Sequence, residues 1–211
     1  GNKSSWTREE IEGSLKSTTI WNPNLFYNIW TLKFGGTSSN LLGYAQFPDQ
    51  SGLSGLNETG GPASTDGVVI QYTSFGSADK GNFPIMQAPY NKGRTLSHET
   101  GHWLGLRHIW GDGNCADDFV SDTPPQASSS SGCPIGRFSC GATNMVENYM
   151  DYTNDACMNI FTKGQKTRIQ AVIELSPRRK SLIDANLCSP IVADVPTPNF
   201  SSDKQLILLG G

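Results

Sequence analysis

The stretch His98-Glu99-Thr100-Gly101-His102-Trp103-Leu104-Gly105-Leu106-Arg107-His108 contains all three histidines of the chain. On a helix, residues four apart lie on the same face, so His98 and His102 can present ring nitrogens to one ion. Gly105 can enter the left-handed conformation without a steric penalty, so we expect it to end the helix and let His108 approach the same ion. The stretch therefore predicts a metal centre made of three imidazoles.

This ligand set is typical of catalytic zinc. Three neutral imidazoles leave the fourth tetrahedral position open, whereas a structural zinc site fills all four. Zinc lowers the pKa of a water in that position to about 7 and polarises a scissile carbonyl. Glu99 follows the first ligand and points beside the metal, where it can act as general base on the zinc-bound water. The alternative, a helix with ordinary surface histidines, leaves their register unexplained.

Four other segments surround the motif. They are Gly93–Ser97, Ile109–Asp112, Asp117–Pro124 and Asn148–Thr153. With the extended zinc motif they resemble the metzincin clan of metalloendopeptidases, and within it the compact microbial members of the pappalysin family, from about Trp21 to about Ala171. The resemblance implies a zincin-like α+β fold: a twisted mixed sheet and an active-site helix above a loop-rich, disulfide-bridged lower subdomain. It also implies a secreted zinc endopeptidase whose partners are protein or peptide substrates.

The apolar pattern places secondary structure along the chain. Branched and aromatic runs predict strands at 25–34, 42–47 and 67–72, with a Gly/Ser/Asn-rich loop at 50–66. A helix is expected over about 94–104. Thr162 and Gln165 have the spacing of a capping box that opens a later helix. We expect one catalytic domain over 1–188, divided into an upper subdomain (1–108) and a lower subdomain (109–188).

The N-terminus departs from the pappalysin pattern. Metzincin upper subdomains begin with a strand, a long backing helix and a second strand, yet only about twenty residues precede the strand expected at 25–34. The segment Trp6–Ile11 is too short to supply them. Either this chain is an N-terminally shortened fragment or those elements come from elsewhere, and we expect a three-stranded remnant with one face of its sheet exposed.

Composition excludes several classes of function. A net charge of −3 without a basic run argues against nucleic-acid binding. No stretch approaches the ~20 apolar residues of a membrane span. No signal peptide is present, so we expect a mature or trimmed product. The 23 glycines, 12 prolines and 17% charged residues indicate a loop-rich extracellular surface.

Cysteine usage fits a secreted protein. Four of the five cysteines (Cys115, Cys133, Cys140 and Cys157) follow the zinc motif. They allow three pairings, and metal ligation is a competing use, although no C-x-x-C pair occurs. The pappalysin resemblance implies the crossed pairs Cys115–Cys140 and Cys133–Cys157. Cys188 remains as a buried free thiol or pairs with something outside this sequence.

The string Asn148-Tyr149-Met150-Asp151-Tyr152 forms a second functional cluster. Met150 resembles the methionine of the turn beneath the metzincin zinc site, where a soft thioether packs against the histidines; taken alone it would be an ordinary core residue. Tyr152 resembles the tyrosine beside the metal, whose hydroxyl can donate to the oxyanion of the tetrahedral intermediate. The alternative for Tyr152 is an ordinary buried tyrosine.

Asp155 resembles the aspartate at the floor of the pocket for the side chain after the scissile bond. A buried carboxylate there favours bidentate pairing with arginine over lysine. The resemblance therefore implies cleavage on the amino side of arginine, with lysine second. The alternative is that Asp155 caps a turn beside Asn154.

The acidic run 117–123 resembles the calcium-binding loop of the microbial pappalysins. Calcium prefers carboxylate, hydroxyl and carbonyl oxygens. The resemblance implies Asp118, Thr123 and the carbonyl of Ser121 as ligands of a structural Ca²⁺. Aspartates in loops are also commonly just solvated.

The composition changes after Cys188. Residues 189–198 predict an extended linker, and 199–204 resemble the opening strand of an immunoglobulin-like module, although a secreted tail fits equally. The rival function for the whole chain is a catalytically silent binding or adhesion fragment that retains its metal for structure. Loss of Glu99 would have favoured that rival. A zinc amidase acting on a small molecule is disfavoured by the extended motif and the Met150 turn.

Overall fold

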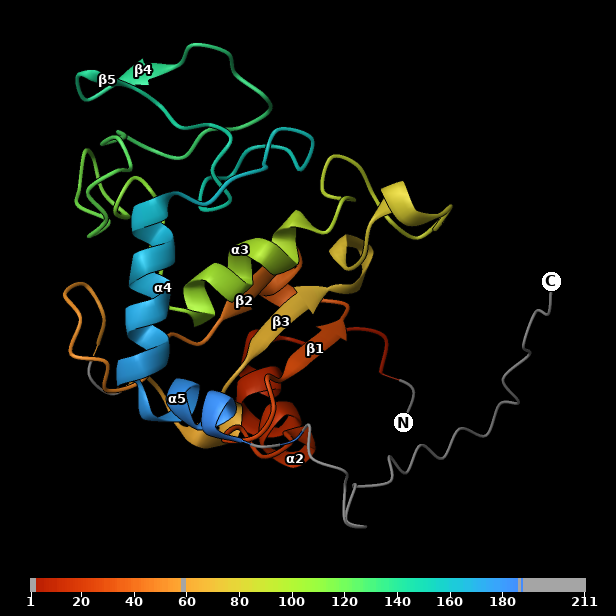
Figure 1. The fold of residues 1–211 in the computed structure, drawn as a ribbon. Coiled ribbons are helices and arrows are strands. Elements are labelled where there is room, and N and C mark those ends of the chain that lie inside the picture. The colour runs from red at the N-terminus through yellow and green to blue at the C-terminus, as the bar shows by residue number, and fades with distance from the viewer. Residues whose placement is uncertain (1–2, 58–59, 186, 188–211) are drawn as a thin grey trace.

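The computed structural model describes residues 3–57, 60–185 and 187. Its centre is a three-stranded mixed sheet in the order β1-β3-β2. β1 (Ile29–Leu32) runs parallel to β3 (Val68–Gln71), and β2 (Gly43–Ala45) pairs with β3 in antiparallel orientation. Each strand lies inside a predicted run but is shorter than predicted. β2 is an edge strand, and α3 (Arg94–Trp103) lies across β2 and β3 (Figure 1).

The end of α3 follows from Gly105. This glycine has a φ of 85°, and its N–H donates to the His102 carbonyl at 2.9 Å. The next N–H, from Leu106, reaches back to the Gly101 carbonyl at 2.9 Å, which completes a Schellman motif. A Cβ at Gly105 would also lie 2.6 Å from a methyl of Val172. Both the left-handed backbone and the lack of space therefore require glycine here. The helix therefore ends where the sequence predicts.

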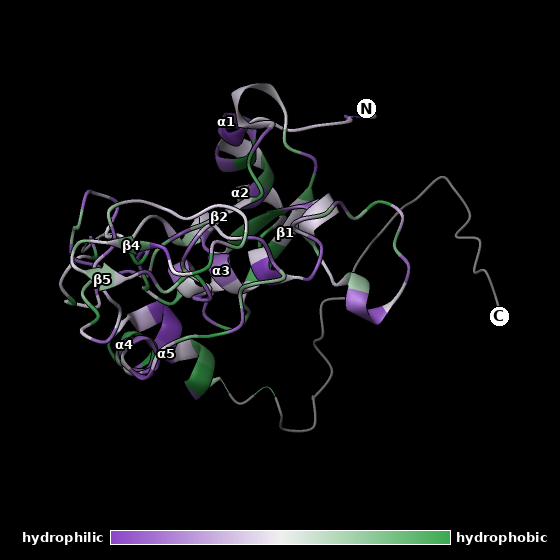
Figure 2. Cartoon of the chain, turned by 90° about the horizontal axis from the view of Figure 1, so that it is seen from above, coloured by the Kyte–Doolittle hydropathy of each residue, from purple (hydrophilic) through white to green (hydrophobic). Residues whose placement is uncertain are grey.

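The N-terminal segment corrects one expectation. Three short helical segments, α1 (Arg8–Glu10), a π-helical turn (Ile11–Leu15) and α2 (Lys16–Thr19), follow one another without a break behind a capping box made by Thr7 and Glu10. Ile11 is fully buried against Phe34 and Val69, so the helical run covers one face of the sheet while α3 covers the other (Figure 2). Trp6 also pairs with Phe34 as an isolated parallel bridge. The prediction of an exposed sheet face is wrong.

The hydrophobic pattern of the sequence does not reveal this helical run, because the buried face of the run includes a lysine. Lys16 is 1% exposed, forms an ion pair with Glu12 at 2.6 Å, and lies with its Nζ over the rings of Trp30 and Tyr44 at 5.4 and 4.8 Å. Tyr44 donates its hydroxyl to Glu12 at 2.7 Å. Burial lowers the pKa of Lys16. A buried ammonium requires such partners, and here β1 and β2 supply both rings.

Two helices close the described chain. α4 (Lys163–Leu175) opens with the predicted capping box of Thr162 and Gln165. α5 (Pro177–Asp184) was not predicted. Arg179 of α5 makes a bidentate ion pair with buried Asp66 (2.6 and 3.0 Å), donates Nε to the Trp103 carbonyl at 2.9 Å, and lies 3.7 Å from the centre of the Trp103 ring. α5 is thereby fixed to the C-terminal end of α3.

The lower part of the molecule is mostly irregular. Its regular sheet is a two-stranded hairpin, β4 (Phe138–Ser139) with β5 (Ala142–Thr143), at the top of Figure 1. Disulfides join Cys115 to Cys140 and Cys133 to Cys157, the crossed pairing that the resemblance implies. Short 3-10 turns complete the elements: Gly36–Ser38, Ala63–Thr65, Tyr72–Ser74 and Ala78–Lys80.

Some expectations have no counterpart here. Among the described residues, every helix is too short or too polar to traverse a lipid bilayer. The predicted linker and module opening at 189–211, and Cys188, lie outside the described residues. The division of 1–188 into two subdomains stays a prediction.

Candidate metal centre

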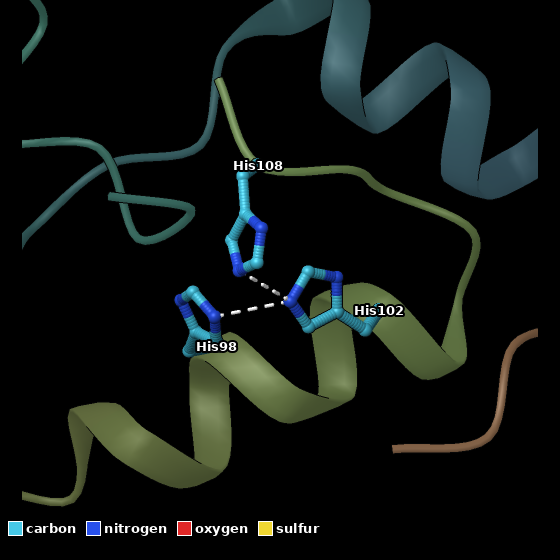
Figure 3. Close-up of side chains that lie close together, drawn as sticks. All are labelled: His98, His102 and His108. Atoms are coloured by element: carbon cyan, nitrogen blue, oxygen red, sulfur yellow. Dashed lines mark hydrogen bonds between the residues drawn. The ribbon is translucent and has the colours of Figure 1, made fainter. Parts of the chain in front are cut away.

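The three histidines meet at one point (Figure 3). The Nε2 atom of His102 lies 3.1 Å from the Nε2 of His98 and 3.1 Å from the Nε2 of His108. His98 and His102 are presented by successive turns of α3, and His108 enters from the loop after Gly105. One ligand atom from each ring lies within 4.8 Å of the others, the only such group of metal-ligating residues in the described part of the chain.

Hydrogen bonds fix which nitrogen of each ring faces the centre. The Nδ1 of His98 lies 2.7 Å from the Tyr149 carbonyl, and the Nδ1 of His102 lies 2.8 Å from the Leu106 carbonyl. A carbonyl only accepts, so each Nδ1 carries the hydrogen and each Nε2 keeps its lone pair. His108 donates its Nδ1 hydrogen to the carboxylate of Asp112. All three lone pairs therefore point at the same space.

This arrangement fits zinc. Nitrogens about 2.0–2.1 Å from a tetrahedral zinc ion lie about 3.3 Å from one another, close to the 3.1 Å seen here. Lone pairs that face each other at this distance repel unless a cation lies between them. Burial and the neighbouring imidazoles lower the pKa of His98 and of His102 to about 3. The rings are therefore neutral near pH 7, the form that binds a metal.

Glu99 lies beside this centre and is almost fully buried. Strand β2 passes directly over it, since a Cβ at Gly43 would lie 2.8 Å from the Glu99 Cγ. Burial raises the pKa of Glu99 to about 8. A carboxyl whose pKa lies near neutrality can both take up and release a proton at physiological pH.

Two aromatic side chains border His108. Trp110 stacks on its ring with centroids 4.2 Å apart and an interplanar angle of 7°. Tyr152 approaches it edge-on at 4.8 Å and lies 5.5 Å from the His98 ring. Burial raises the pKa of Tyr152 to about 12, so its hydroxyl keeps its hydrogen and can donate. Tyr152 therefore lies next to the centre, as its resemblance implies.

Met150 lies directly beneath α3. It is fully buried with Leu106 and Ile109. A Cβ at Gly101 would lie 2.4 Å from its sulfur, so the methionine reaches the helix backbone between the two histidine turns. The thioether thus packs against α3 at Gly101 and against Leu106 after the helix end; its packing against the histidine rings stays a prediction.

The turn around Met150 is held by two amide side chains. Asn148 accepts from the Met150 N–H at 2.9 Å and exchanges two hydrogen bonds with Gln165, at 2.9 and 3.1 Å. The same Gln165 accepts from the Thr162 N–H at 2.9 Å as the capping residue of α4. One glutamine therefore ties the start of α4 to the turn beneath the centre.

A cavity of about 280 Å³ opens beside the histidines. Its lining includes His98, Glu99 and Tyr152 together with Asp155 and Arg94. Asp155 is 2% exposed and accepts backbone N–H groups of Lys92 at 2.7 Å and Arg94 at 3.3 Å through Oδ2. Burial raises its pKa.

The acidic loop brings part of its predicted ligand set together. The Thr123 hydroxyl lies 2.8 and 2.9 Å from the two oxygens of buried Asp118. Within the described ranges no lysine or arginine nitrogen lies within 4.0 Å of that carboxylate. Burial raises its pKa to about 6.

Sequence reasoning missed three residues of this region. Trp110 and Asp112 were noticed only as parts of a matching segment, and Arg94 only as a neighbour of the motif. Asp112 had a usable signal, because an acidic residue four positions after a ligand histidine can accept its second ring hydrogen. The stacking of Trp110 had none, since it depends on how the loop turns.

Comparison with known proteins identifies relatives. The family model for peptidase family M43, described as pregnancy-associated plasma protein-A, matches residues 13–174. Extracellular metalloprotease 1 of Coccidioides posadasii is 39% identical over 173 residues, which cover 80% of this chain and 56% of that protein. An extracellular metalloprotease of Podospora anserina is 41% identical over 170 residues, covering 76% of this chain and 50% of that protein. The chain thus spans about half the length of these curated relatives.

Solved structures agree with this assignment. Mature mirolysin of Tannerella forsythia, in complex with a cleaved peptide, superposes with a TM-score of 0.70 at 39% identity, covering 89% of this chain and 69% of that chain. Mirolysin in complex with a compound gives a TM-score of 0.71 at 39% identity over 90% and 69% of the two chains. The likeness confirms the predicted zincin-like α+β fold. The chain belongs to the pappalysins, peptidase family M43.

Proposed function

We propose that this chain is the catalytic domain of a secreted zinc endopeptidase, with His98, His102 and His108 as the metal ligands. The observation that carries the proposal is the convergence of three ring nitrogens with their lone pairs free. The relatives named extracellular metalloproteases support both the activity and the compartment. The mirolysin complex with a cleaved peptide supports a peptide substrate.

The residues around the histidines have distinct chemical roles. When zinc is bound, it acidifies a coordinated water and polarises the carbonyl of the scissile bond. Glu99 accepts the proton of the attacking water and passes it to the leaving amine. The Tyr152 hydroxyl donates to the oxygen that gains negative charge, which stabilises the transition state. Met150 keeps α3 in place from below.

Substrate would lie beside β2. An edge strand offers main-chain N–H and C=O groups to an extended peptide, and β2 borders both α3 and the cavity. The side chain after the scissile bond would then enter the cavity. The cavity lining includes Asp155, whose Oδ1 has no hydrogen-bond partner among the described residues. A guanidinium fits this free oxygen, so we propose cleavage before arginine and, second, before lysine.

Arg94 tempers this preference. It lines the same cavity, and its Nε is buried without a hydrogen-bond partner in the described part of the chain. No ion pair within 4.0 Å joins Arg94 to Asp155 there, so the carboxylate stays available. The positive charge of Arg94 should therefore make the preference for arginine weaker than it would be with Asp155 alone.

The acidic loop is proposed to hold a structural Ca²⁺ through Asp118, Thr123 and the Ser121 carbonyl. The buried carboxylate, which forms no ion pair within 4.0 Å among the described residues although Arg168 interacts with it at longer range, supports this. Calcium would supply a positive charge in direct contact with the Asp118 carboxylate. We also propose that residues 1–188 form the catalytic domain, with 189–211 as a linker or the start of an immunoglobulin-like module.

The test is digestion of an unfolded protein with and without a zinc chelator, with the cut sites read by mass spectrometry. We expect cuts before arginine that stop when zinc is removed and return with stoichiometric zinc. Glu99→Ala should bind zinc and cut at least about 10³ times more slowly. Equal cutting by that variant contradicts the proposed mechanism. Zinc binding without any hydrolysis by the wild type would instead favour the silent binding fragment.

A separate variant tests the pocket. Asp155→Asn keeps the size of the side chain and can still accept the two backbone N–H groups. We expect the preference for arginine to fall by about ten-fold or more while cutting before apolar residues persists. Cut sites that are unchanged in this variant contradict the role of Asp155.

A further inference from the structure

His108 differs from the other two ligand candidates in what fixes its ring. His98 and His102 donate Nδ1–H to main-chain carbonyls, which α3 and its C-terminal turn hold in place. His108 lies on a loop, and its Nδ1–H goes to a side chain, the carboxylate of Asp112. It is also the most exposed of the three, with 15% of its side chain accessible. Its orientation therefore depends on the side chain of Asp112.

The neighbouring aromatic rings do not replace this hydrogen bond. Trp110 stacks almost parallel to the imidazole and Tyr152 meets it at 77°, so together they hold the ring plane. A half-turn about the Cβ–Cγ bond returns the imidazole to the same plane, so stacking alone does not distinguish its two orientations. Only an acceptor at Nδ1 determines which nitrogen keeps the lone pair that faces His98 and His102.

Asp112 is itself fixed, although 42% of its side chain is accessible. One carboxylate oxygen accepts from His108 and the other from Arg107 Nη2 at 3.1 Å. Arg107 also donates Nη1 to the Gly55 carbonyl at 3.3 Å, and its guanidinium lies 5.9 Å from the Phe119 ring. The backbone of Asp112 has a φ of 61°, a conformation that aspartate and asparagine tolerate better than most residues.

We propose that Asp112, held by Arg107, is the positioning residue that orients His108 toward the zinc. This rests on the proposed function, since it takes His108 as a zinc ligand. A carboxylate partner fixes the tautomer of a ligand histidine and strengthens its donation to the metal, and loss of such a partner typically weakens metal binding by about 10–100-fold. Neither Asp112 nor Arg107 belongs to the group of residues that would ligate the ion.

The main test is Asp112→Asn. Asparagine keeps the size and the left-handed backbone, but it loses the charge and turns an N–H₂ toward Arg107 or His108. We expect its zinc affinity, measured at constant pH by competition with a fluorescent chelator, to be about 10–100 times weaker than that of the wild type. The visible spectrum of the cobalt-substituted protein should change as well. Asp184→Asn is the matched control, because among the described residues that exposed carboxylate pairs with Lys180 alone; both readouts should stay as in the wild type.

Arg107→Met tests the second half of the proposal. It should weaken zinc binding by less than Asp112→Asn does, and it should add nothing when Asp112 is already replaced. Additive losses would mean that Arg107 acts independently of Asp112, and they contradict the proposal. If Asp112→Asn does not fold, Arg107→Met alone decides, since an affinity equal to the wild type then overturns the positioning role.

These outcomes distinguish a failure of the positioning role of Asp112 from a failure of the proposed function. Folded Asp112→Asn with wild-type zinc affinity and an unchanged cobalt spectrum overturns this inference and leaves the proposed function intact. A wild-type protein that binds no stoichiometric zinc overturns the proposed function, and the positioning role with it.

Discussion

The upper and lower parts of this molecule build one site by different physical means. Above, the sheet, the helical run and α3 pack apolar side chains, and two histidines take their places from helix geometry. Below, residues 109–161 have little regular structure and depend on two disulfides and buried polar side chains such as Asp151, Asn148 and Gln126. A regular scaffold thus positions ligands through its backbone, whereas an irregular one positions them side chain by side chain.

The largest effect should come from the buried ion pair of the upper part. Arg179→Met removes the guanidinium from Asp66 and from the Trp103 ring. A buried carboxylate that loses its partner typically costs about 3–5 kcal/mol of stability. Arg178 also contacts Asp66, at 3.2 Å, so we expect the lower end of that range. Denaturant unfolding measures it.

The control for this prediction lies one residue on. Lys180→Met removes an exposed ion pair with Asp184 on the same helix. Such pairs contribute about 0–1 kcal/mol. If the two variants are equally stable, α5 does not anchor α3.

Reduction of the disulfides should loosen the lower part selectively. Each bridge closes a loop of 24 or 25 residues, which corresponds to roughly 3 kcal/mol in the chain-entropy description. We expect amide hydrogen exchange to rise across 109–161 while β3 and α3 stay protected. A uniform rise over the whole chain would mean that the two parts unfold as one and are not stabilised separately.

One added methyl group at Gly101 should disrupt the contact between α3 and Met150, which joins the two parts. Gly101→Ala places a Cβ 2.4 Å from the sulfur of Met150. Displacing a buried side chain in a packed core costs about 1–3 kcal/mol, and zinc affinity should fall with it because both helical ligands flank this position. Calorimetry and chelator competition measure the two effects.

Gly13→Ala provides the matched control. A Cβ at this helical position meets nothing within 4 Å. Alanine is about 0.5–1 kcal/mol more favourable than glycine in a helix, so this variant should be slightly more stable than the wild type. A loss of stability at Gly13 similar to that at Gly101 would show that the Met150 contact is not the cause.

The smallest effect concerns the acidic loop and pH. The pKa of Asp118 in the folded chain is raised to about 6 by burial, above its ordinary 3.8. The folded state therefore binds this proton more readily than the unfolded state, and without calcium stability should rise by about 1 kcal/mol as pH falls from 7 toward 5. Calcium should raise the melting temperature at pH 7.5 and much less at pH 5.

Asp118→Asn sharpens this prediction. It removes the buried charge, so the metal-free variant should be more stable than the wild type at pH 7.5 and should not respond to calcium. A variant that still gains stability from calcium would place the ion elsewhere.

The sequence predicted the parts of the site that are local in the chain. The spacing of His98 and His102 and the helix end at Gly105 follow from helix geometry alone, and the Thr162–Gln165 capping box follows from a four-residue pattern. The disulfide pairing came from resemblance, since spacing left three choices.

The two helical segments that the sequence did not predict share one physical cause. The helical run at 8–19 and α5 each bury a charged side chain, Lys16 and Arg179, where a hydrophobic pattern expects an apolar one. Their partners, Glu12 with two aromatic rings and Asp66 with Trp103, are assembled by tertiary structure. Helices stabilised in this way are invisible to periodicity, because the buried face reads as polar.

The double role of Gln165 has a consequence for how the lower part melts. Its side-chain oxygen receives two donors, one from the first residue before α4 and one from the amide below the centre. When that end of α4 frays, the turn around Met150 therefore loses the hydrogen bond between Asn148 and Gln165 at the same time. Heat or denaturant should dissolve both in a single cooperative step, and loss of the metal should accompany it instead of preceding it.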